Sequence, residues 1–332
     1  MQVRDFPRMR SAARRLLCAA SAMLAVVVCG AVSPAWAGQS LWVANNASAN
    51  LEQFQHRQLI ETGLPRPNLI ALLRNPLGLA FDRKGNLWIT AGNTEVQEIT
   101  AKQLDKLGKK SAPTPTVTIT SSSFQFLVGS NFDSAGNLWI ADASGAIYEL
   151  SAAQLQAGSA NLTPAITLTA SANFNSPQFV AFDKAGDLWV SDEGASAVFE
   201  FTPEQLAAGG NQVPRVISDG LAAPGELAFD HKKNLWVTNY DNSTVVEYSK
   251  ADLASITNPA PAIVITSPNN ILNGAWGLAF DVSGDMWVAN YTTGSIMKFG
   301  PVQLTDPDSQ RPKVFLGGAN NFSYQITFGP TT

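Results

Sequence analysis

Residues 40–54 read SLWVANNASANLEQF, and the same pattern recurs downstream with one difference. Each later copy begins with a short apolar segment, as in GLAFDRKGNLWITAGNTEVQEI at 78–99 and GLAFDVSGDMWVANYTTGSIMKF at 277–299. The first copy lacks this segment. Residues 321–330, NFSYQITFGP, form an isolated segment of the same type, in which Phe328 aligns with Phe81. We therefore expect residues 321–330 to complete the first copy, which only a closed ring of repeats allows.

A Leu-Trp or Met-Trp pair marks each repeat. The six tryptophans are Trp42, Trp88, Trp139, Trp189, Trp236 and Trp287. Their spacings of 46, 51, 50, 47 and 51 residues define units of about 49 residues, each long enough for four short strands. Internal repeats of this length are typical of propellers. The sequence predicts an all-β fold, a six-bladed β-propeller of four-stranded blades that fills residues 38–332.

Within a unit, the strand order can be read from local patterns. A first apolar strand A is followed by a turn of the form Asp-x-x-Gly-Asn, as at 82–86, and by the Trp-containing strand B. The alternating strand C leads into a Ser/Thr-x-x-Gln/Asp motif, which predicts one capped helical turn with its Leu directed inward. The expected outer strands D lie at 116–120, 165–169, 215–218, 262–266 and 313–317.

The first 37 residues have a different character. Five arginines precede an apolar stretch at 16–32, and SPAWA at 33–37 ends in a small-x-small site. This order is that of a secretory signal peptide, and translation from Met9 would give it a more usual length. We expect cleavage after Ala37 and export to the periplasm or the medium. Both cysteines, Cys18 and Cys29, lie in this leader, so no disulfide is expected in 38–332.

Charge restricts the partners. The leader holds five of the 22 basic residues and one of the 26 acidic residues, which leaves about −8 for residues 38–332. No basic patch is evident, which argues against nucleic acid as a partner. No stretch beyond the leader is long and apolar enough to span a membrane.

The repeats resemble NHL-type propeller repeats, whose pattern runs P-x-G-[LV]-A-[FV]-D-x-x-G-N-[LI]-[WY]-V-A-[DN]. The resemblance covers residues 38–332 and implies a propeller fold, which hosts many functions. Similar propellers include metal-dependent lactone hydrolases of the senescence-marker and gluconolactonase group, virginiamycin B lyase, and NHL propellers that bind proteins or other ligands.

The resemblance to the lactonases also implies where a metal would bind. Their Glu, Asn and Asp ligands stand at the second position of the P-x-G pattern. In this chain that position holds Leu77, Val128, Gln178, Gly225, Trp276 and Tyr324. A hard cation needs several oxygen ligands, largely carboxylates, so we expect no metal and no cofactor. The neighbouring position offers one acid, Glu226.

The lyases use His and Glu near the channel. After the leader this chain has only His56, which follows strand C of the first unit, and His231, in an A–B turn. A propeller places A–B turns on the face opposite the D–A and B–C loops, so we interpret both as surface residues. No nucleophile–base pair is evident.

The face formed by the D–A and B–C loops is the candidate binding surface, because it carries aromatic and amide side chains that differ between repeats. Such a surface suits a neutral polar ligand. The candidate ligand-binding residues are Gln178, Glu226, Trp276, Tyr324, Gln325, Tyr240, Tyr291 and Asp192. Two structural alternatives stand beside this interpretation. The rings could fill the channel as core, and Asp192 could cap a turn, as could Asn45, Asp142, Asn239 and Asn290 at the same position.

Three functions remain open. The first is an exported, non-enzymatic binding or scaffold propeller that takes a protein, peptide or glycan on this face. The alternative is a divergent hydrolase or lyase of lactonase type, with its site at the channel mouth and Glu226 as acid or base. The third is a purely structural component of the cell envelope.

Overall fold

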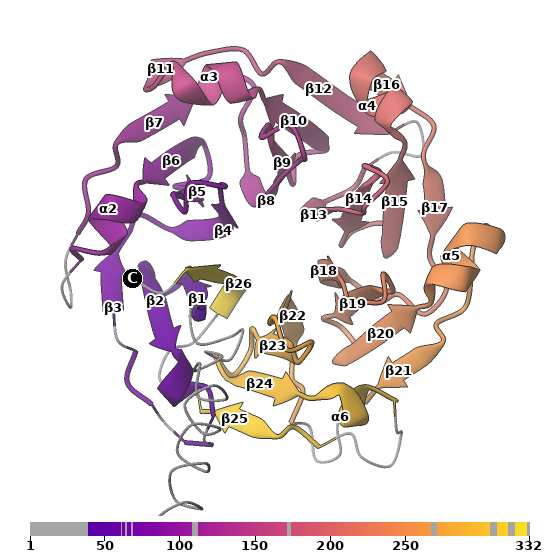
Figure 1. Cartoon of the computed structure of the whole chain (residues 1–332). Coiled ribbons are helices and arrows are strands. Elements are labelled where there is room, and N and C mark those ends of the chain that lie inside the picture. Colours follow the sequence, from indigo (N-terminus) through magenta and orange to yellow (C-terminus); the bar gives the residue numbers. More distant parts are fainter. Residues whose placement is uncertain are drawn as a thin grey trace, which may run out of the picture. The chain divides into compact units, whose positions relative to one another are not determined.

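The computed structural model describes residues 39–330 except 61, 64, 68, 108–111, 171–173, 267–270, 306–310 and 318–322. Their strands form six sheets. The sheets stand as blades around a central axis (Figure 1), which confirms the predicted six-bladed propeller. The predicted leader, residues 1–37, and the first two residues of the predicted closing strand, 321 and 322, lie outside the described residues.

Each blade has four strands, A to D, from the axis outward, and blades are numbered from the one that contains Trp42. The A strands of blades 1 to 6 are β26 (Ser323–Pro330), β4 (Pro76–Phe81), β8 (Leu127–Phe132), β13 (Pro177–Phe182), β18 (Pro224–Phe229) and β22 (Ala275–Phe280). The B strands are β1 (Gln39–Asn45), β5 (Leu87–Ala91), β9 (Leu138–Asp142), β14 (Leu188–Asp192), β19 (Leu235–Asn239) and β23 (Met286–Asn290).

The outer half of each blade follows the same order. The C strands are β2 (Asn50–Gln55), β6 (Glu95–Ile99), β10 (Ala146–Leu150), β15 (Ala197–Phe201), β20 (Thr244–Tyr248) and β24 (Ile296–Phe299). The D strands are β3 (Leu69–Leu72), β7 (Val117–Thr120), β12 (Ile166–Ala170), β17 (Arg215–Ile217), β21 (Ile263–Ile265) and β25 (Val314–Leu316). Short helices follow strand C: η1 (His56–Gln58), α2 (Ala101–Leu104), α3 (Ala152–Gln156), α4 (Pro203–Ala208), α5 (Lys250–Ser255) and α6 (Pro301–Thr305).

Blade 1 is assembled from both ends of the described chain. β26 pairs antiparallel with β1, and Phe328 lies opposite Leu41 just as Phe81 lies opposite Leu87 in blade 2. Figure 1 shows the yellow β26 beside the indigo β1. The prediction that a C-terminal segment completes the first repeat is therefore confirmed.

The recurring tryptophans join neighbouring blades. Each packs against a Phe near the end of strand A of the next blade, with ring centroids 5.8–6.4 Å apart. The six pairs are Trp42–Phe81, Trp88–Phe132, Trp139–Phe182, Trp189–Phe229, Trp236–Phe280 and Trp287–Phe328. The last pair again crosses the closure, so one type of aromatic contact runs around the whole ring and stabilises every blade interface.

The local motifs form the predicted turns and caps. In the turn at 82–86, Asp82 Oδ1 accepts the backbone N–H groups of Lys84 at 2.8 Å and Asn86 at 2.9 Å. Gly85 has φ +78° there, and Lys233 takes the same left-handed conformation at φ +71° in blade 5. Capping boxes begin α2, α3 and α4, with Thr100, Ser151 and Thr202 as their N-caps.

Two short strands were not predicted. β11 (Ala160–Asn161) pairs in parallel with β7 of the preceding blade, and β16 (Gly210–Gln212) does the same with β12. A parallel bridge from Gly63 to Leu316 connects blades 1 and 6 in the same way. The connection between strands C and D therefore ties its blade to the outer strand of the blade before it.

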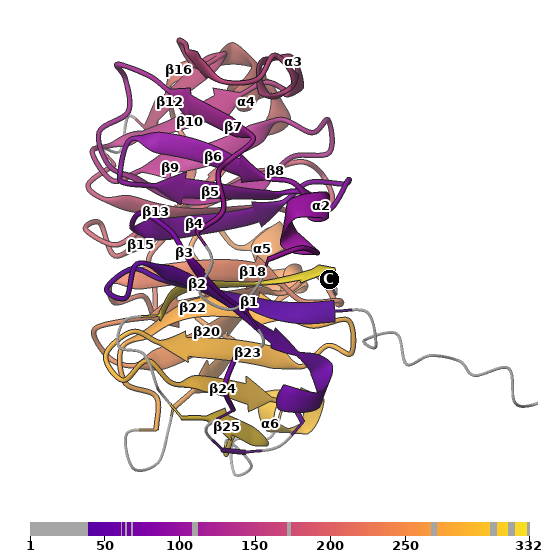
Figure 2. The same cartoon turned by 90° about the vertical axis from the view of Figure 1, so that its left-hand side faces the viewer.

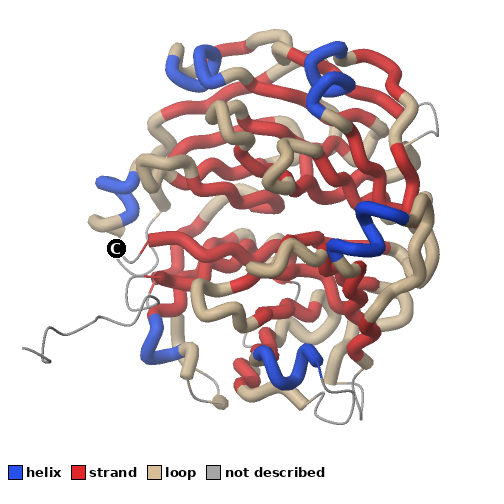
Figure 3. Tube along the Cα trace, turned by 45° about the vertical axis from the view of Figure 1, so that its right-hand side comes forward, coloured by secondary structure: helices blue, strands red, loops and turns tan. Residues whose placement is uncertain are grey.

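The propeller has two faces with different contents. We call the face with the B–C turns and D–A loops the loop face, and the face with the A–B turns and helices the turn face. Figure 2 shows α2, α3 and α6 along one edge, the turn face. Figure 3 shows the helices as short additions to strands that make up most of the fold. Among the described residues no helix has the length and apolar character needed to cross a bilayer.

Candidate functional site

Glu226 lies on the channel wall, where the first residues of strand A approach the axis. It is 7% exposed. Its Oε2 accepts the backbone N–H of Leu278 at 2.7 Å, and its Oε1 accepts Nε2 of Gln325 at 2.8 Å. Gln325 Oε1 in turn accepts the N–H of Leu79 at 2.5 Å. These bonds connect the A strands of blades 5, 6, 1 and 2 across the closure.

Burial governs the ionisation of this carboxyl group. It raises the pKa of Glu226 to about 8, although the hydrogen bonds from Leu278, Gln325 and the backbone of Ile326 act in the opposite direction. Near neutral pH the side chain therefore holds its proton for most of the time. Both carboxyl oxygens accept hydrogen bonds from the channel wall, so Glu226 links neighbouring A strands.

Five aromatic rings form one cluster at the loop-face end of the channel. Their centroid separations range from 5.5 Å for Trp276–Tyr324 to 6.2 Å for Trp276–Tyr291. The other members are Phe179 and Tyr240. Phe179 and Trp276 are buried, whereas the three tyrosines are half-buried. The structure thus supports a mixed interpretation: the inner rings fill the channel, and the outer rings form its mouth.

Trp276 has an unusual feature within this cluster. Its side chain is only 5% exposed, yet its indole Nε1 has no hydrogen-bond partner among the described residues. A buried N–H without a partner costs about 1–3 kcal/mol. The mouth of the channel therefore holds a donor that an acceptor on a ligand could satisfy.

Polar side chains border the rings. Tyr324 Oη donates to Gln178 Oε1 at 2.9 Å. Gln178 Nε2 donates to Ser176 Oγ at 2.7 Å and to Glu193 Oε2 at 2.9 Å. Burial raises the pKa of Tyr324 and, together with nearby Asp241 and Asp192, that of Glu193. The mouth therefore combines neutral hydroxyl and amide groups with one partly buried carboxyl group.

Asp192 has a different role from its neighbours at the mouth. It is fully buried, and its two oxygens accept the backbone N–H groups of Asn175, Ser176 and Ala195 at 2.8–2.9 Å. Asp142 holds the equivalent loop of blade 3 by the same kind of bonds. The arrangement agrees with the turn-capping alternative, because these carboxylate oxygens point into their own loop.

The positions that would carry lactonase ligands line the channel, as expected from strand A. They hold three apolar side chains, one glycine, one amide and one phenol, and no group of three His, Cys, Asp or Glu within the described ranges could hold a metal ion. His231 is exposed on the turn face, and His56 lies in η1 beside Lys298 and Asp281, far from the aromatic cluster in the fold.

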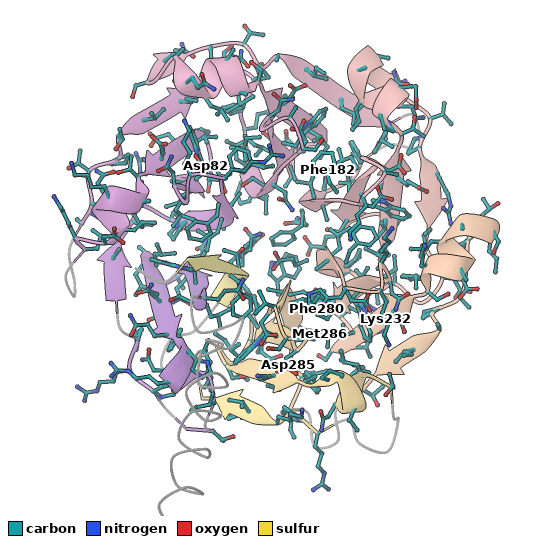
Figure 4. The ribbon with its side chains drawn as sticks, viewed as in Figure 1. Asp82, Phe182, Lys232, Phe280, Asp285 and Met286 are labelled. Atoms are coloured by element: carbon teal, nitrogen blue, oxygen red, sulfur yellow. The ribbon has the colours of Figure 1, made fainter. Side chains whose placement is uncertain are left out.

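The turn face contains features that the sequence interpretation missed. Opposite each Trp of strand B, the register of strand C places Gln53, Glu98, Glu149, Glu200, Glu247 or Lys298. Cavities open beside these pairs, one of about 650 Å³ between blades 2 and 3 and another of about 650 Å³ between blades 4 and 5. A smaller one of about 210 Å³ lies between blades 5 and 6, where Figure 4 labels Lys232 and Phe280.

Several solved structures share this fold at low sequence identity. A protein of unknown function from Bacteroides caccae aligns with a TM-score of 0.59 and 13% identity, over 88% of this chain and 99% of that chain. A streptogramin B lyase aligns with a TM-score of 0.50 and 14% identity, over 81% of this chain and 72% of that chain.

Virginiamycin B lyase from Staphylococcus aureus aligns with a TM-score of 0.49 and 15% identity, over 68% of this chain and 67% of that chain. Comparison with family models gives no match, and comparison with curated proteins gives none either. At these identities the likeness concerns the fold alone. The six-bladed propeller is established by this chain's own sheets, and the structures that align with a TM-score of 0.50 or more share its fold at low identity.

Proposed function

We propose that this chain is an exported, non-enzymatic binding propeller whose loop face takes a neutral polar ligand, namely a glycan or a peptide segment of a partner protein. The observation that carries the proposal is the unpartnered indole N–H of Trp276, buried at a mouth formed by half-exposed tyrosines. Aromatic faces with a few fixed polar groups are typical of sites for such ligands.

The engagement of Glu226 supports a binding role over a catalytic one. Its oxygens accept the N–H of Leu278 and the amide of Gln325, both of which belong to the channel wall. A general acid or base must reach the reacting group of a substrate within hydrogen-bond distance. Glu226 would have to give up these partners to do so.

Binding can be tested with an array of neutral glycans and short peptides, read by the intrinsic fluorescence of the purified protein. Trp276→Phe keeps the ring and removes the N–H, so we expect it to weaken binding about 3- to 10-fold, the value of one neutral hydrogen bond. Trp42→Phe is the matched control, because Trp42 Nε1 is equally unpartnered but lies in the blade 1–2 contact.

Equal affinity of the Trp276→Phe variant and the wild type would contradict the proposal, as would an array on which no glycan or peptide binds. Tyr240→Ala and Tyr291→Ala provide a second check, since both are half-buried members of the cluster whose ring centroids lie 5.9 Å apart. Either change should reduce affinity if the ligand stacks on the tyrosines.

A hydrolase or lyase remains the second candidate because Glu226 combines burial with a pKa raised to about 8, a property of many general acids. This candidate predicts turnover of lactone or ester substrates that disappears in Glu226→Gln. Activity that persists in this variant would exclude Glu226 as the catalytic group.

Export is proposed from the leader at residues 1–37. N-terminal sequencing of protein recovered from outside the cytoplasm should begin at Gly38. Recovery of an intact N-terminus in the cytoplasmic fraction would contradict export by this route.

A further inference from the structure

The cavity between blades 4 and 5 on the turn face differs from its counterparts in how its polar groups are satisfied. In blades 2, 3 and 5 the turn Asp accepts both an Asn side chain and the indole N–H of the blade's Trp. In blade 3, for example, Asp133 Oδ2 accepts Nδ2 of Asn137 at 2.8 Å and Nε1 of Trp139 at 3.1 Å. Every group of this set has a partner there.

Blade 4 carries Asp187 at the position of this Asn. The backbone N–H of Asp187 donates to Asp183 Oδ1 at 3.0 Å, and burial, followed by the charge of Asp183, raises the pKa of the Asp187 carboxyl group. Trp189 does not bond to Asp183. Its Nε1 has no partner among the described residues, although the side chain is only 2% exposed. Blade 4 thus contains a pair of acidic side chains and an indole N–H without a partner.

Blade 6 carries the same substitution, and there a lysine neutralises the two acids. There Asp285 replaces the Asn, and Lys298 places its ammonium group against Asp285 and 3.7 Å from Asp281. The ammonium also lies 5.2 Å from the centroid of Trp287, whose Nε1 keeps its bond to Asp281 at 3.0 Å. Blade 6 therefore supplies a primary ammonium group to the paired carboxylates.

Blade 4 has no equivalent ammonium at this point. The position of Lys298 is taken by Glu200, which is itself bonded to Arg215 at 2.8 Å. The guanidinium of Arg215 covers the ring of Trp189 and is further held by the backbone carbonyls of Leu253, Ile256 and Thr257. Four hydrogen bonds thus hold this guanidinium beside Glu200 and the 250–257 segment, while Asp183 and Asp187 line a cavity of about 650 Å³.

The opening of this cavity has the opposite charge. Its lining includes three exposed lysines, Lys184, Lys233 and Lys250, while Phe182, Phe229 and Trp189 form apolar walls. A ligand with a cationic end inside and an anionic end at the rim would complement both regions. A polycation such as a polyamine would be repelled by the rim.

We propose that this cavity binds a zwitterionic amine, an α-amino acid or the free N-terminus of a short peptide. The ammonium group takes the place that Lys298 Nζ occupies in blade 6, between Asp183 and Asp187. An oxygen of the adjacent carboxylate or carbonyl accepts the indole N–H of Trp189, and the rim lysines attract the terminal carboxylate. This site lies on the face opposite the mouth proposed above and does not depend on it.

The test is a titration of ¹⁵N-labelled full-chain protein, followed through the indole N–H signals. Glycine and triglycine are the two probes, and they separate a free amino acid from a peptide N-terminus. N-acetylglycine and ethylammonium each carry half of the proposed ligand. We expect glycine or triglycine to shift one indole signal, which Trp189→Phe identifies by its loss, and each half-ligand to bind at least tenfold more weakly.

Asp187→Asn restores the residue found in blades 2, 3 and 5, so it should keep the fold and weaken binding at least tenfold. Asp285→Asn is the matched control, because it makes the same change in blade 6, outside the cavity, and should leave affinity within twofold. The proposal is overturned if Asp187→Asn binds like the wild type, or if neither probe shifts the Trp189 signal. Binding of glycine at the loop face would instead shift Trp276.

Discussion

Gln325 Nε2 donates to Glu226 Oε1 at 2.8 Å, so the strand that closes blade 1 is bonded directly to the channel wall of blade 5. The same amide accepts the N–H of Leu79 in blade 2 at 2.5 Å. Closure of the ring therefore involves more than the pairing of β26 with β1. A polar chain inside the channel holds β26 from both sides.

Stability should depend on pH through Glu226. Its pKa is about 8 in the folded protein and near 4.5 in the unfolded chain, so between these values the folded state holds a proton that the unfolded state has released. The contribution of this group is complete below pH 4.5 and falls by about 1.4 kcal/mol per pH unit until the pH passes 8.

Glu226→Gln removes this dependence. Urea unfolding of both proteins across this range should show the variant less stable at the acidic end, with the difference shrinking as the pH rises. Parallel stability profiles for the two proteins would mean that Glu226 does not hold a proton in the folded state.

Deletion of residues 323–330 should prevent stable folding, because β1 loses its inner partner and the Trp287–Phe328 contact disappears. The structure also offers a rescue. Pro330 lies opposite Gln39, so residues 323–330 can be moved ahead of Gln39 through a copy of the turn at 82–86. Circular dichroism and thermal melting should show recovery in the relocated form. Failure of the relocated strand to restore a cooperative transition would contradict the closure.

Lys298→Met should lower the free energy of unfolding by about 3 kcal/mol, because it leaves Asp281 and Asp285 together without a cation in a partly buried setting. The double variant Lys298→Glu/Asp285→Asn recreates the Asn–Glu combination of Asn86 and Glu98 in blade 2 and should recover most of this loss. Lys232→Met, at an exposed turn, should change stability by no more than about 0.5 kcal/mol. Chemical denaturation measures all three, and a double variant no more stable than Lys298→Met would contradict the coupling.

Gly329→Ala should destabilise the closure by about 1–3 kcal/mol, because a Cβ at this position would collide with the ring of Phe81. Phe81→Leu removes the ring that the new Cβ would meet. The double variant Gly329→Ala/Phe81→Leu should therefore lose less free energy of unfolding than the sum of the two single changes. A double-mutant cycle from melting or urea data gives the coupling energy, and a value near zero would show that the two residues do not meet.

The fold could be predicted because its sequence pattern repeats at regular intervals. The tryptophans recur with their apolar strand A, and the match of Phe328 to Phe81 revealed the closure without any knowledge of contacts. β11 and β16 escaped prediction for a physical reason. They are two and three residues long and pair through backbone groups, so their sequences, AN and GNQ, carry no hydrophobic pattern.

The candidate site was harder to predict for a related reason. The sequence placed Trp276 and Tyr324 on the same face, and the structure brings their rings to 5.5 Å. The sequence could not show that Gln325 donates a hydrogen bond to Glu226, because the two residues are distant in sequence and belong to different blades. The change from Asn to Asp187 is visible in the sequence. The register of the strands is needed to show that Glu200 lies opposite Trp189, where blade 6 has Lys298 opposite Trp287.

The closure also decides the order in which the protein can mature. Blades 2 to 6 consist of consecutive hairpins that can form while the chain is being made, whereas β1 is synthesised long before β26. Until residues 323–330 emerge, the inner edge of β1 is open, and the β26 of a second molecule could occupy it equally well. We expect refolding at high protein concentration to produce strand-exchanged dimers, visible by gel filtration, and dilution before refolding to favour the monomeric ring.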